Sequence, residues 1–398
     1  MRIAIVKPII PWPAVQGTRR VTMGLIDALA GEHEVTLVAP SLDAADEVAA
    51  DTLARERNIR VVTVRAPNRR SLFHRGWYRA AYAVAARLGG HSPRALYATP
   101  PALFDRLARE SAGHPFDLAI FEYWYTYRAF HRVPSRHRVL LAHDADFAIA
   151  GRKDGASFAS AESRREAEAC RNVEEVWTLT TADREALAAH AGLPRDRFRI
   201  MPFGVDTTAL DLEAGSNDGT VLFFGAWQAD FNVDALGWLL DEIWPAVKRR
   251  LPTTRLEVAG GGMPEALAER VRKAGGTVSG RVEDLAALYR RAAVVLIPLR
   301  FGGGLRIRLI EALAARRAVV STAIGIGGLE GRDGRDWLLA SDAEGLAEAT
   351  ACVLRDPALG RRLGEAGREL VATRYSDASA AEGLRRLVTR FDDRRATG

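Results

Sequence analysis

The chain has 398 residues, of which 48% are hydrophobic and 27% charged, and its formal net charge at pH 7 is +6. This length indicates two domains, and the composition is typical of a globular protein and excludes a collagen-like, disordered or membrane-spanning chain. Only four of the 56 basic residues are lysine, so we attribute the arginine excess to a GC-rich genome and take the charge as weak evidence for nucleic-acid binding.

The first residues, MRIAIVKPII, form an apolar run that is too short for a secretory signal and predicts a first strand. No apolar run is long enough to cross a membrane, so we expect a cytoplasmic protein. The two cysteines, Cys170 and Cys352, give neither a metal-binding pattern nor a disulfide framework. We therefore expect no metal site and no cofactor.

The loop after this strand contains three prolines, where a dinucleotide-binding fold would have a glycine fingerprint. Proline has no amide hydrogen to offer a pyrophosphate, so an NAD site here is unfavourable. Gly17, with Arg19 and Arg20, precedes a predicted helix over residues 21–30. Two interpretations stay open for this point: an anion site, or a glycine turn beside solvated arginines.

Strands and helices then alternate, which predicts a parallel α/β sheet with helices on both faces. The expected strands cover residues 34–39, 59–64, 117–122, 138–142 and 175–179, and the expected helices cover 44–56 and 161–172. His143 follows one of these strands, beside Asp144 and Asp146. Polar residues at such a position line a crevice in open α/β sheets, so we favour a site residue that binds sugar hydroxyls or an acceptor over a structural histidine.

Residues 65–87 interrupt the alternation with six arginines, no acidic residue and four interleaved aromatic residues. A basic helix of this kind lies on an anionic membrane surface in some proteins. A helix that packs its aromatic side chains inward and solvates its arginines would have the same composition. Both interpretations stay open, so Arg65 to Arg87 is a candidate for peripheral membrane contact.

A second α/β series begins at Val221, which indicates two Rossmann-like, doubly wound domains that face a cleft. The first domain is expected to cover residues 1–206 and to bind the acceptor. The second is expected to cover residues 207–375 and to bind a nucleotide. A final helix over residues 376–398 is expected to pack back on the first domain.

The second domain contains a strand, a glycine run (Gly302, Gly303, Gly304), a helix that opens near Leu305 and a second strand expected over residues 318–321. A glycine loop between a strand end and a helix start exposes backbone amides to an anion, and the helix dipole adds positive potential. Arg306 is expected before the first full turn and points into this loop. Arg308 and Glu311 share a helix side away from the apolar face.

Two guanidiniums at such a helix start suit a diphosphate through forked hydrogen bonds. The carboxylate of Glu311, one turn further on, suits ribose hydroxyls. An exposed pair between Arg308 and Glu311 beside an ordinary glycine turn is the alternative.

Three segments together, VLFFGAWQADFNVDALGWLL, the core from GRVEDL to GGLEG, and PFGVD, resemble the GT-B retaining glycosyltransferases of family 4. The closest likeness is to a branch with a GGG-T-R-x-K-x-x-E-A motif that is common in bacterial polysaccharide and secondary-metabolite gene clusters. The resemblance is strong only over residues 221–374. It implies transfer of a sugar from a nucleoside-diphosphate sugar to a glycan, lipid-linked or small-molecule acceptor, with anomeric retention.

The resemblance also implies roles for particular residues. Arg306 and Arg308 would hold the diphosphate and act in catalysis, and Glu311 would accept from the ribose. Other residues expected at the donor are Gly17, Gly225, Arg281 near the base, Gly302, Gly303, Gly304, and His143 as a catalytic group near the donor sugar. The donor base, whether that of UDP, GDP or TDP, is not implied.

This chain departs from the family pattern at several positions. Gly303 stands where the first glutamate of an E-x7-E motif is expected, so one sugar contact is missing. Arg308 replaces a lysine, and Leu305 replaces a threonine. Trp227 and Gln228 stand where many relatives carry Arg and Lys.

Two other functions fit the sequence less well. A nucleotide-sugar epimerase of GT-B-like fold would also bind a nucleoside diphosphate, but it would need acid and base groups in place of an acceptor site. A nucleic-acid-binding protein would show strongly salt-dependent binding. The arginines are scattered and form no recognised nucleic-acid reader motif, so we expect no nucleic-acid partner.

Overall fold

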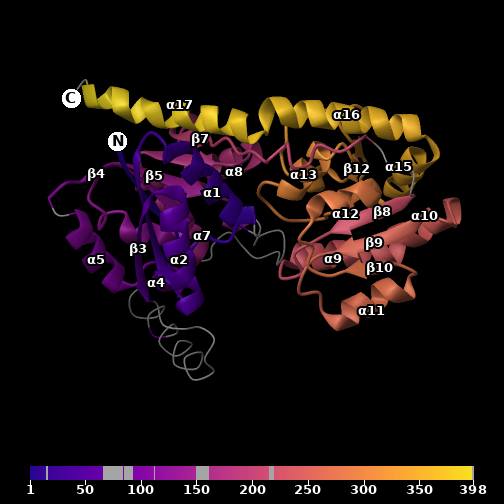
Figure 1. Ribbon diagram of the computed structural model, residues 1–398, viewed down its shortest axis with the longest axis horizontal. Coiled ribbons are helices and arrows are strands. Elements are labelled where there is room, and N and C mark those ends of the chain that lie inside the picture. Colours follow the sequence, from indigo (N-terminus) through magenta and orange to yellow (C-terminus); the bar gives the residue numbers. More distant parts are fainter. Residues whose placement is uncertain are drawn as a thin grey trace. The chain divides into compact units, whose positions relative to one another are not determined.

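The computed structural model describes residues 1–14, 17–65, 84, 93–111, 113–148, 161–214 and 219–396 (Figure 1). The chain divides into two compact units. Unit 1 consists of Met1–Phe203 and Ala380–Gly398, and unit 2 consists of Gly204–Ser379. Each unit has a parallel sheet of its own.

The sheet of unit 1 has the strand order β3-β2-β1-β4-β5-β6-β7. Its strands are β1 (Arg2–Val6), β2 (Glu34–Ser41), β3 (Arg60–Arg65), β4 (Phe116–Glu122), β5 (Ser135–Ala142), β6 (Glu175–Thr178) and β7 (Phe198–Ile200). Ile5 of β1 lies level with Leu37 on one side and with Ile120 on the other. Successive residues of β1 point to opposite faces, and Ala4 and Ile5 are both fully buried, so both faces of the sheet are covered. The strand order reverses between β1 and β4.

The helices of unit 1 lie between successive strands of the sheet, except the last, which follows the segment of unit 2. They are α1 (Gly17–Leu29), α2 (Ala44–Arg57), α4 (Pro93–Ala98), α5 (Pro101–Ser111), α7 (Ala161–Arg171), α8 (Thr181–Ala191), the 3₁₀ turns η1 (Trp124–Ala129) and η2 (Arg195–Arg197), and the end of α17 (Asp377–Ala396). Local chemistry sets several ends. Asp43 caps α2 by accepting from the amide of Asp46, and α8 ends at Gly192, whose φ is 63°.

The sheet of unit 2 has the order β10-β9-β8-β11-β12-β13. Its strands are β8 (Thr220–Phe224), β9 (Arg255–Ala259), β10 (Thr277–Ser279), β11 (Ala292–Ile297), β12 (Ala318–Ser321) and β13 (Leu338–Leu339). The order reverses between β8 and β11. Ligands bind at such a reversal in open α/β sheets, outside the carboxyl ends of the strands, because the flanking loops diverge there.

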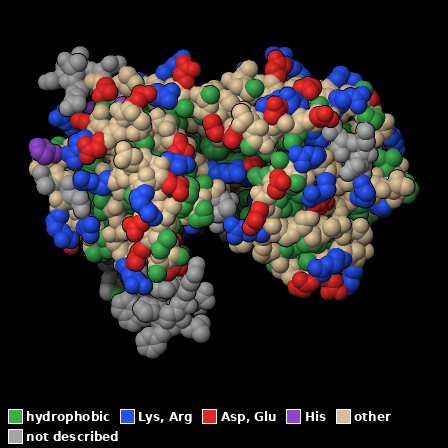
Figure 2. All heavy atoms as spheres, viewed as in Figure 1, with side chains coloured by type: hydrophobic (Ala, Val, Ile, Leu, Met, Phe, Trp, Pro, Cys, Tyr) green, Lys and Arg blue, Asp and Glu red, His purple; other side chains and the backbone are tan. Residues whose placement is uncertain are grey.

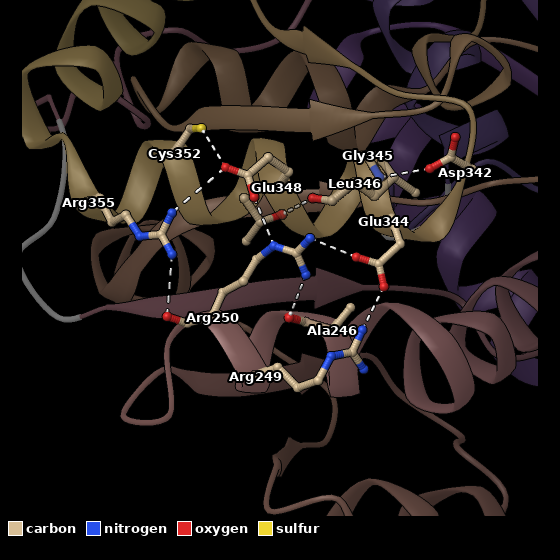
Figure 3. A network of polar contacts seen from close by, with 11 residues as sticks. Ala246, Arg249, Arg250, Asp342, Glu344, Gly345, Leu346, Glu348, Cys352 and Arg355 are labelled. Carbon is tan, nitrogen blue, oxygen red and sulfur yellow. Dashed lines mark hydrogen bonds and ion pairs between the residues drawn. The ribbon is translucent and has the colours of Figure 1, made fainter.

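The helices of unit 2 are α9 (Asp230–Trp238), α10 (Trp244–Arg250), α11 (Glu265–Lys273), α12 (Leu285–Arg291), α13 (Ile307–Ala314), α14 (Ala323–Ile326), α15 (Ala343–Arg355), α16 (Pro357–Arg374) and the π-helical turn η3 (Leu239–Ile243). Figure 3 shows a charged network that joins α10 to α15. Arg250 bonds Glu348 at 2.8 Å and Glu344 at 2.7 Å, and Arg249 bonds Glu344 at 2.6 Å. These side chains are mostly exposed, so the network aligns two surface helices.

The observed architecture confirms the predicted fold class of two doubly wound parallel α/β sheets. The first segment of unit 1 ends at Phe203, whereas the sequence predicted a boundary at residue 206. The final helix, α17, belongs to unit 1 from Ala380 onward, and its Arg390 bonds Glu175 of β6 at 2.5 Å. Among the described helices, none combines the length and apolar character that a membrane span requires.

The predicted membrane-contact segment, Arg65 to Arg87, lies outside the described residues except for Arg65 and Val84. On the face shown in Figure 2, basic and acidic side chains are interspersed over the surface. Within the described part of that face, no single basic patch gathers the arginines.

Candidate functional site: the carboxyl edge of the second sheet

The reversal point of the second sheet is flanked by two loops. The loop after β8 runs from Gly225 into α9, and the loop after β11 carries the glycine run and ends at α13. The sequence placed Arg306 before the first helical turn, and the structure confirms this, because Arg306 directly precedes α13, at its N-cap position. The predicted phosphate-binding turn therefore lies at the edge where an open α/β sheet binds ligands.

Glycine is required at this turn because of backbone conformation and space. Gly302 has a φ of 119° and Gly304 a φ of 75°, which side chains rarely tolerate. A Cβ atom on Gly302 would lie 2.7 Å from Nη2 of Arg306, and one on Gly327 would lie 2.5 Å from its Cγ. The two glycines thus make the slot that the Arg306 side chain occupies. The guanidinium carbon of Arg306 lies 5.0 Å from the ring centroid of Phe231.

Arg308 lies on the first turn of α13 and faces β8. Its Nη1 donates to the carbonyl of Phe224 at 2.8 Å, and its guanidinium carbon lies 4.9 Å from the Phe224 ring centroid. Burial lowers the pKa of Arg308 to about 10, Tyr289 partly opposes this, and the charge of Arg306 lowers the pKa by a smaller amount. Arg308 is still charged at neutral pH. Two positively charged guanidiniums that are removed from water stabilise an anion bound between or beside them.

Glu311 lies one turn further along α13 and is only 3% exposed. The alternative of an ordinary exposed pair between Arg308 and Glu311 is therefore wrong. Amphipathic patterning alone places Glu311 opposite the apolar stripe, but the structure buries that position as well. A buried carboxylate needs hydrogen-bond donors around it. Such a surrounding is expected for a carboxylate that orients a ligand.

The loops that follow β8 and β9 pack against each other at the same edge of the sheet. Gly225 donates from its amide to Ala259 at 3.0 Å, and the indole Nε1 of Trp227 donates to the carbonyl of Gly260 at 3.0 Å. A Cβ atom on Gly260 would lie 1.9 Å from the carbonyl oxygen of Gly225, so only glycine permits this approach. The exposed Arg281 sets its Cβ beside Gly261.

The structure thus brings Gly225, Arg281, Gly302, Gly304, Arg306 and Arg308 to loops or turns on one edge of the unit 2 sheet. Sequence reasoning missed Gly260 and the two aromatic partners of the arginines, Phe224 and Phe231. The three consecutive glycines after the strand RLEVA were a sequence signal for Gly260. Stacking of an arginine on a ring that lies far away in sequence gives no local signal.

Two predicted residues belong to unit 1. Gly17 is the first residue of α1, so the helix begins four residues earlier than predicted. His143 follows β5, is 2% exposed, and bonds from Nε2 to Oε2 of Glu122 at 2.7 Å. Sequence reasoning missed Glu122 and its buried partner Lys7, whose Nζ lies 2.5 Å from the same oxygen. Burial alone would raise the pKa of Glu122, but Lys7 and His143 outweigh it and lower that pKa to about 2.

A metal site would need several ligating side chains close together. Over the ranges that the structure describes, no group of three or more His, Cys, Asp or Glu side chains is arranged to hold a metal ion. The positive charge near the glycine turn comes from arginines.

Residues 218–356 match the model of the family described as glycosyl transferases group 1. The match covers much of unit 2, including the glycine turn, both arginines and Glu311. It supports a group 1 glycosyltransferase.

A curated protein of Klebsiella pneumoniae, described as an uncharacterized 44.6 kDa protein in the cps region, is 28% identical over 131 residues. The aligned part is 31% of this chain and 34% of that protein, so the chain spans only about a third of this relative.

Solved structures match over almost the whole chain. Sucrose-phosphate synthase from Thermosynechococcus elongatus aligns with a TM-score of 0.68 at 18% identity and covers 99% of both chains. Anabaena Alr3699/HepE in complex with UDP aligns with a TM-score of 0.66 at 15% identity and covers 98% of this chain and 100% of its own. At these identities the likeness shows the fold, which is that of GT-B glycosyltransferases.

Proposed function

We propose that the protein is a glycosyltransferase that moves a sugar from a nucleoside-diphosphate sugar to an acceptor hydroxyl, with retention of anomeric configuration. One observation carries this proposal. Arg306 and Arg308, both stacked on aromatic rings, lie at a glycine turn and helix start beside the reversal point of the sheet. A diphosphate matches this arrangement because it offers two charged groups to two forked donors.

The roles within unit 2 follow from position. The backbone at Gly302, Gly303 and Gly304 approaches the phosphates without side-chain obstruction, and the start of α13 adds positive potential. Glu311 accepts from the ribose hydroxyls. Gly225 and Arg281 lie toward the base. In unit 1, the resemblance supports contributions from Gly17 and His143.

The proposed chemistry relies on stabilisation of the leaving group. Departure of a nucleoside diphosphate builds negative charge on the β-phosphate, and preorganised guanidiniums and amides stabilise that charge most when it is fully developed. Because two arginines already supply positive charge, we propose that the transfer needs no metal cofactor. Arg308 in place of a lysine keeps this charge and presents its N–H donors in a planar fork.

The donor base is the first unknown to resolve. HepE has been solved with UDP and with UDP-glucose, which makes the uridine nucleotide the first candidate, ahead of GDP and TDP. We propose a glycan, lipid-linked or small-molecule hydroxyl as acceptor. A basic segment that touches lipid would favour the lipid-linked class.

A donor panel tests the proposal. The protein is incubated with UDP-, GDP-, TDP- and ADP-glucose, with and without EDTA, and release of the nucleoside diphosphate is followed with and without a mixture of glycan acceptors. We expect release from one donor, unaffected by EDTA and accelerated by acceptor. Conversion of the donor sugar to an epimer without any acceptor would instead identify an epimerase.

A further inference from the structure

Unit 1 holds a buried polar cluster at the reversal point of its own sheet. Lys7 follows β1, Glu122 ends β4 and His143 follows β5, and their exposures are 0%, 0% and 2%. The register pairs Val6 with Phe121, which sets Lys7 directly beside Glu122. The cluster therefore lies at the carboxyl edge where β1 and β4 diverge, which is the ligand-binding position of this sheet type.

A single oxygen atom organises the cluster. Oε2 of Glu122 accepts from Nζ of Lys7 at 2.5 Å, from Oγ1 of Thr22 at 2.9 Å, and from Nε2 of His143 at 2.7 Å. An ionised carboxylate can only accept, so the Nε2 atom of His143 must carry a hydrogen. In a neutral imidazole, Nδ1 is then left with its lone pair and acts as an acceptor.

Burial favours the neutral imidazole of His143. Burial lowers its pKa, and Lys7 lowers it further, while Glu122 and the more distant Asp146 raise it. Lys7 balances the charge of Glu122 within the cluster, so the carboxylate does not by itself hold a proton on the ring. Tyr123 stacks on the imidazole with centroids 4.4 Å apart.

Among the residues that the structure describes, two buried acceptor atoms of the cluster meet no hydrogen-bond donor: Oε1 of Glu122 and Nδ1 of His143. Buried polar atoms are rarely left unsatisfied, and those that are often mark a function. Tyr123, between them in sequence, has a φ of 68° and a ψ of 142°, which is unusual for a residue with a side chain. A hydroxyl group has one hydrogen to donate, so it would satisfy one of these two atoms.

We propose that Lys7 and Glu122 are positioning residues, which hold His143 as the neutral tautomer protonated on Nε2 and so present Nδ1 as an acceptor to a sugar hydroxyl. The sugar as ligand rests on the proposed function, whereas the tautomer rests on the cluster alone. A hydroxyl of the donor sugar and a hydroxyl of the acceptor share this chemistry.

The first test reads the tautomer directly. Two-bond ¹H–¹⁵N correlation spectra at pH 7 distinguish the protonated from the unprotonated ring nitrogen, and His143→Gln assigns the signal among the eight histidines. We expect a protonated Nε2 and an unprotonated Nδ1 in the wild type. In Lys7→Met/Glu122→Gln, where no charge is left unpaired and the amide can donate as well as accept, we expect the Nδ1–H form to become populated. A wild-type ring that is cationic or protonated on Nδ1 would overturn the proposal, as would a variant with an unchanged tautomer.

The second test reads the ligand. UDP, UDP-glucose and free glucose are added separately, and binding is confirmed by the melting temperature. A shift of the Nδ1 resonance with UDP-glucose but not with UDP identifies a donor-sugar hydroxyl, and a shift with glucose alone identifies an acceptor-type hydroxyl. An Nδ1 signal that stays unchanged both with bound UDP-glucose and with free glucose would overturn the hydroxyl contact.

A matched pair of variants separates positioning from folding. The side chain of His143→Gln can keep the bond to Glu122 but lacks the Nδ1 acceptor, so it should melt near the wild-type temperature and lose at least tenfold in turnover of UDP-glucose. His143→Asn places its amide near Nδ1 and loses the Glu122 bond, so it should melt lower. Equal turnover of wild type and His143→Gln would count against the proposal. Absence of any melting shift with UDP, GDP, TDP or ADP or with their glucose conjugates would instead count against the proposed function, and the tautomer would still decide the positioning role.

Discussion

Removal of one member of the buried Lys7–Glu122 pair should destabilise unit 1 far more than removal of both. Lys7→Met leaves the Glu122 carboxylate buried without its countercharge, and Glu122→Gln leaves the Lys7 ammonium buried in the same way. Lys7→Met/Glu122→Gln removes both charges and keeps an amide oxygen for Thr22 and His143. The exposed pair Lys273–Glu269, at 3.0 Å on α11, is the matched control.

The magnitude follows from burial. Both buried side chains are 0% exposed, and breaking such a pair by removing one partner costs about 3–5 kcal/mol. The pKa of Glu122 is about 2 against an ordinary 4.5, which corresponds to about 3 kcal/mol of preference for its charged form. Burial lowers the pKa of Lys7, which opposes this gain. For a unit of this size, each single variant should melt roughly 6–20 °C lower.

Urea denaturation at pH 7 measures the interaction free energy between Lys7 and Glu122. The wild type, both single variants and the double variant are compared. The free energy of unfolding of the double variant should be at least about 2 kcal/mol higher than that of either single variant. Removal of one partner of the Lys273–Glu269 pair should lower the free energy of unfolding by less than about 1 kcal/mol. Because the folded pKa of Glu122 is depressed, its contribution is present above pH 4.5 and is lost as the pH falls toward about 2. Additive effects of Lys7→Met and Glu122→Gln, with no recovery in the double variant, would refute the reasoning.

Three further predictions concern other positions. Gly302→Ala, at a φ of 119°, should lower the unfolding free energy by more than about 1 kcal/mol and weaken nucleotide binding, whereas Gly24→Ala, which meets nothing within 4 Å in α1, should be neutral or stabilising in thermal melts. Arg308→Lys should retain part of the affinity for a nucleoside diphosphate and Arg308→Met should lose at least tenfold, as measured by calorimetry, because lysine keeps the charge but not the forked donor. Burial raises the pKa of Glu166 to about 8, so wild-type stability should fall as the pH rises from 4.5 to about 8, and Glu166→Gln should flatten that part of the stability–pH curve.

The sequence predicted those parts of the fold that depend on local patterns. The strand at 318–321 was predicted at its observed bounds, because a short β-branched run ends at a polar residue and a glycine turn. Arg306 was placed before the first turn of its helix because a regular helix would have pointed it at the apolar face. Periodicity and glycine placement carry this information within a few residues.

The rest depended on contacts between distant segments. Lys7 and Glu122 are charged residues at the ends of apolar strands, and their 115-residue separation hid the pairing until the register placed them level. Glu311 was assigned to the helix side opposite the apolar residues, but its side chain is buried. The start of α1 was placed four residues late, because the polar first turn at Gly17 carries no apolar period.

The central claim is that the glycine turn and the two arginines of unit 2 bind a nucleoside diphosphate. The most direct measurement is isothermal titration calorimetry of UDP, GDP, TDP and ADP against wild type, Arg308→Met and the surface control Lys273→Met, without metal. We predict that one diphosphate binds wild type and the control equally and Arg308→Met at least tenfold more weakly, and that at a hundredfold excess over Kd it stabilises the fold by about 2.7 kcal/mol. Failure of all four diphosphates to bind the wild type, or equal binding to Arg308→Met, would contradict the claim.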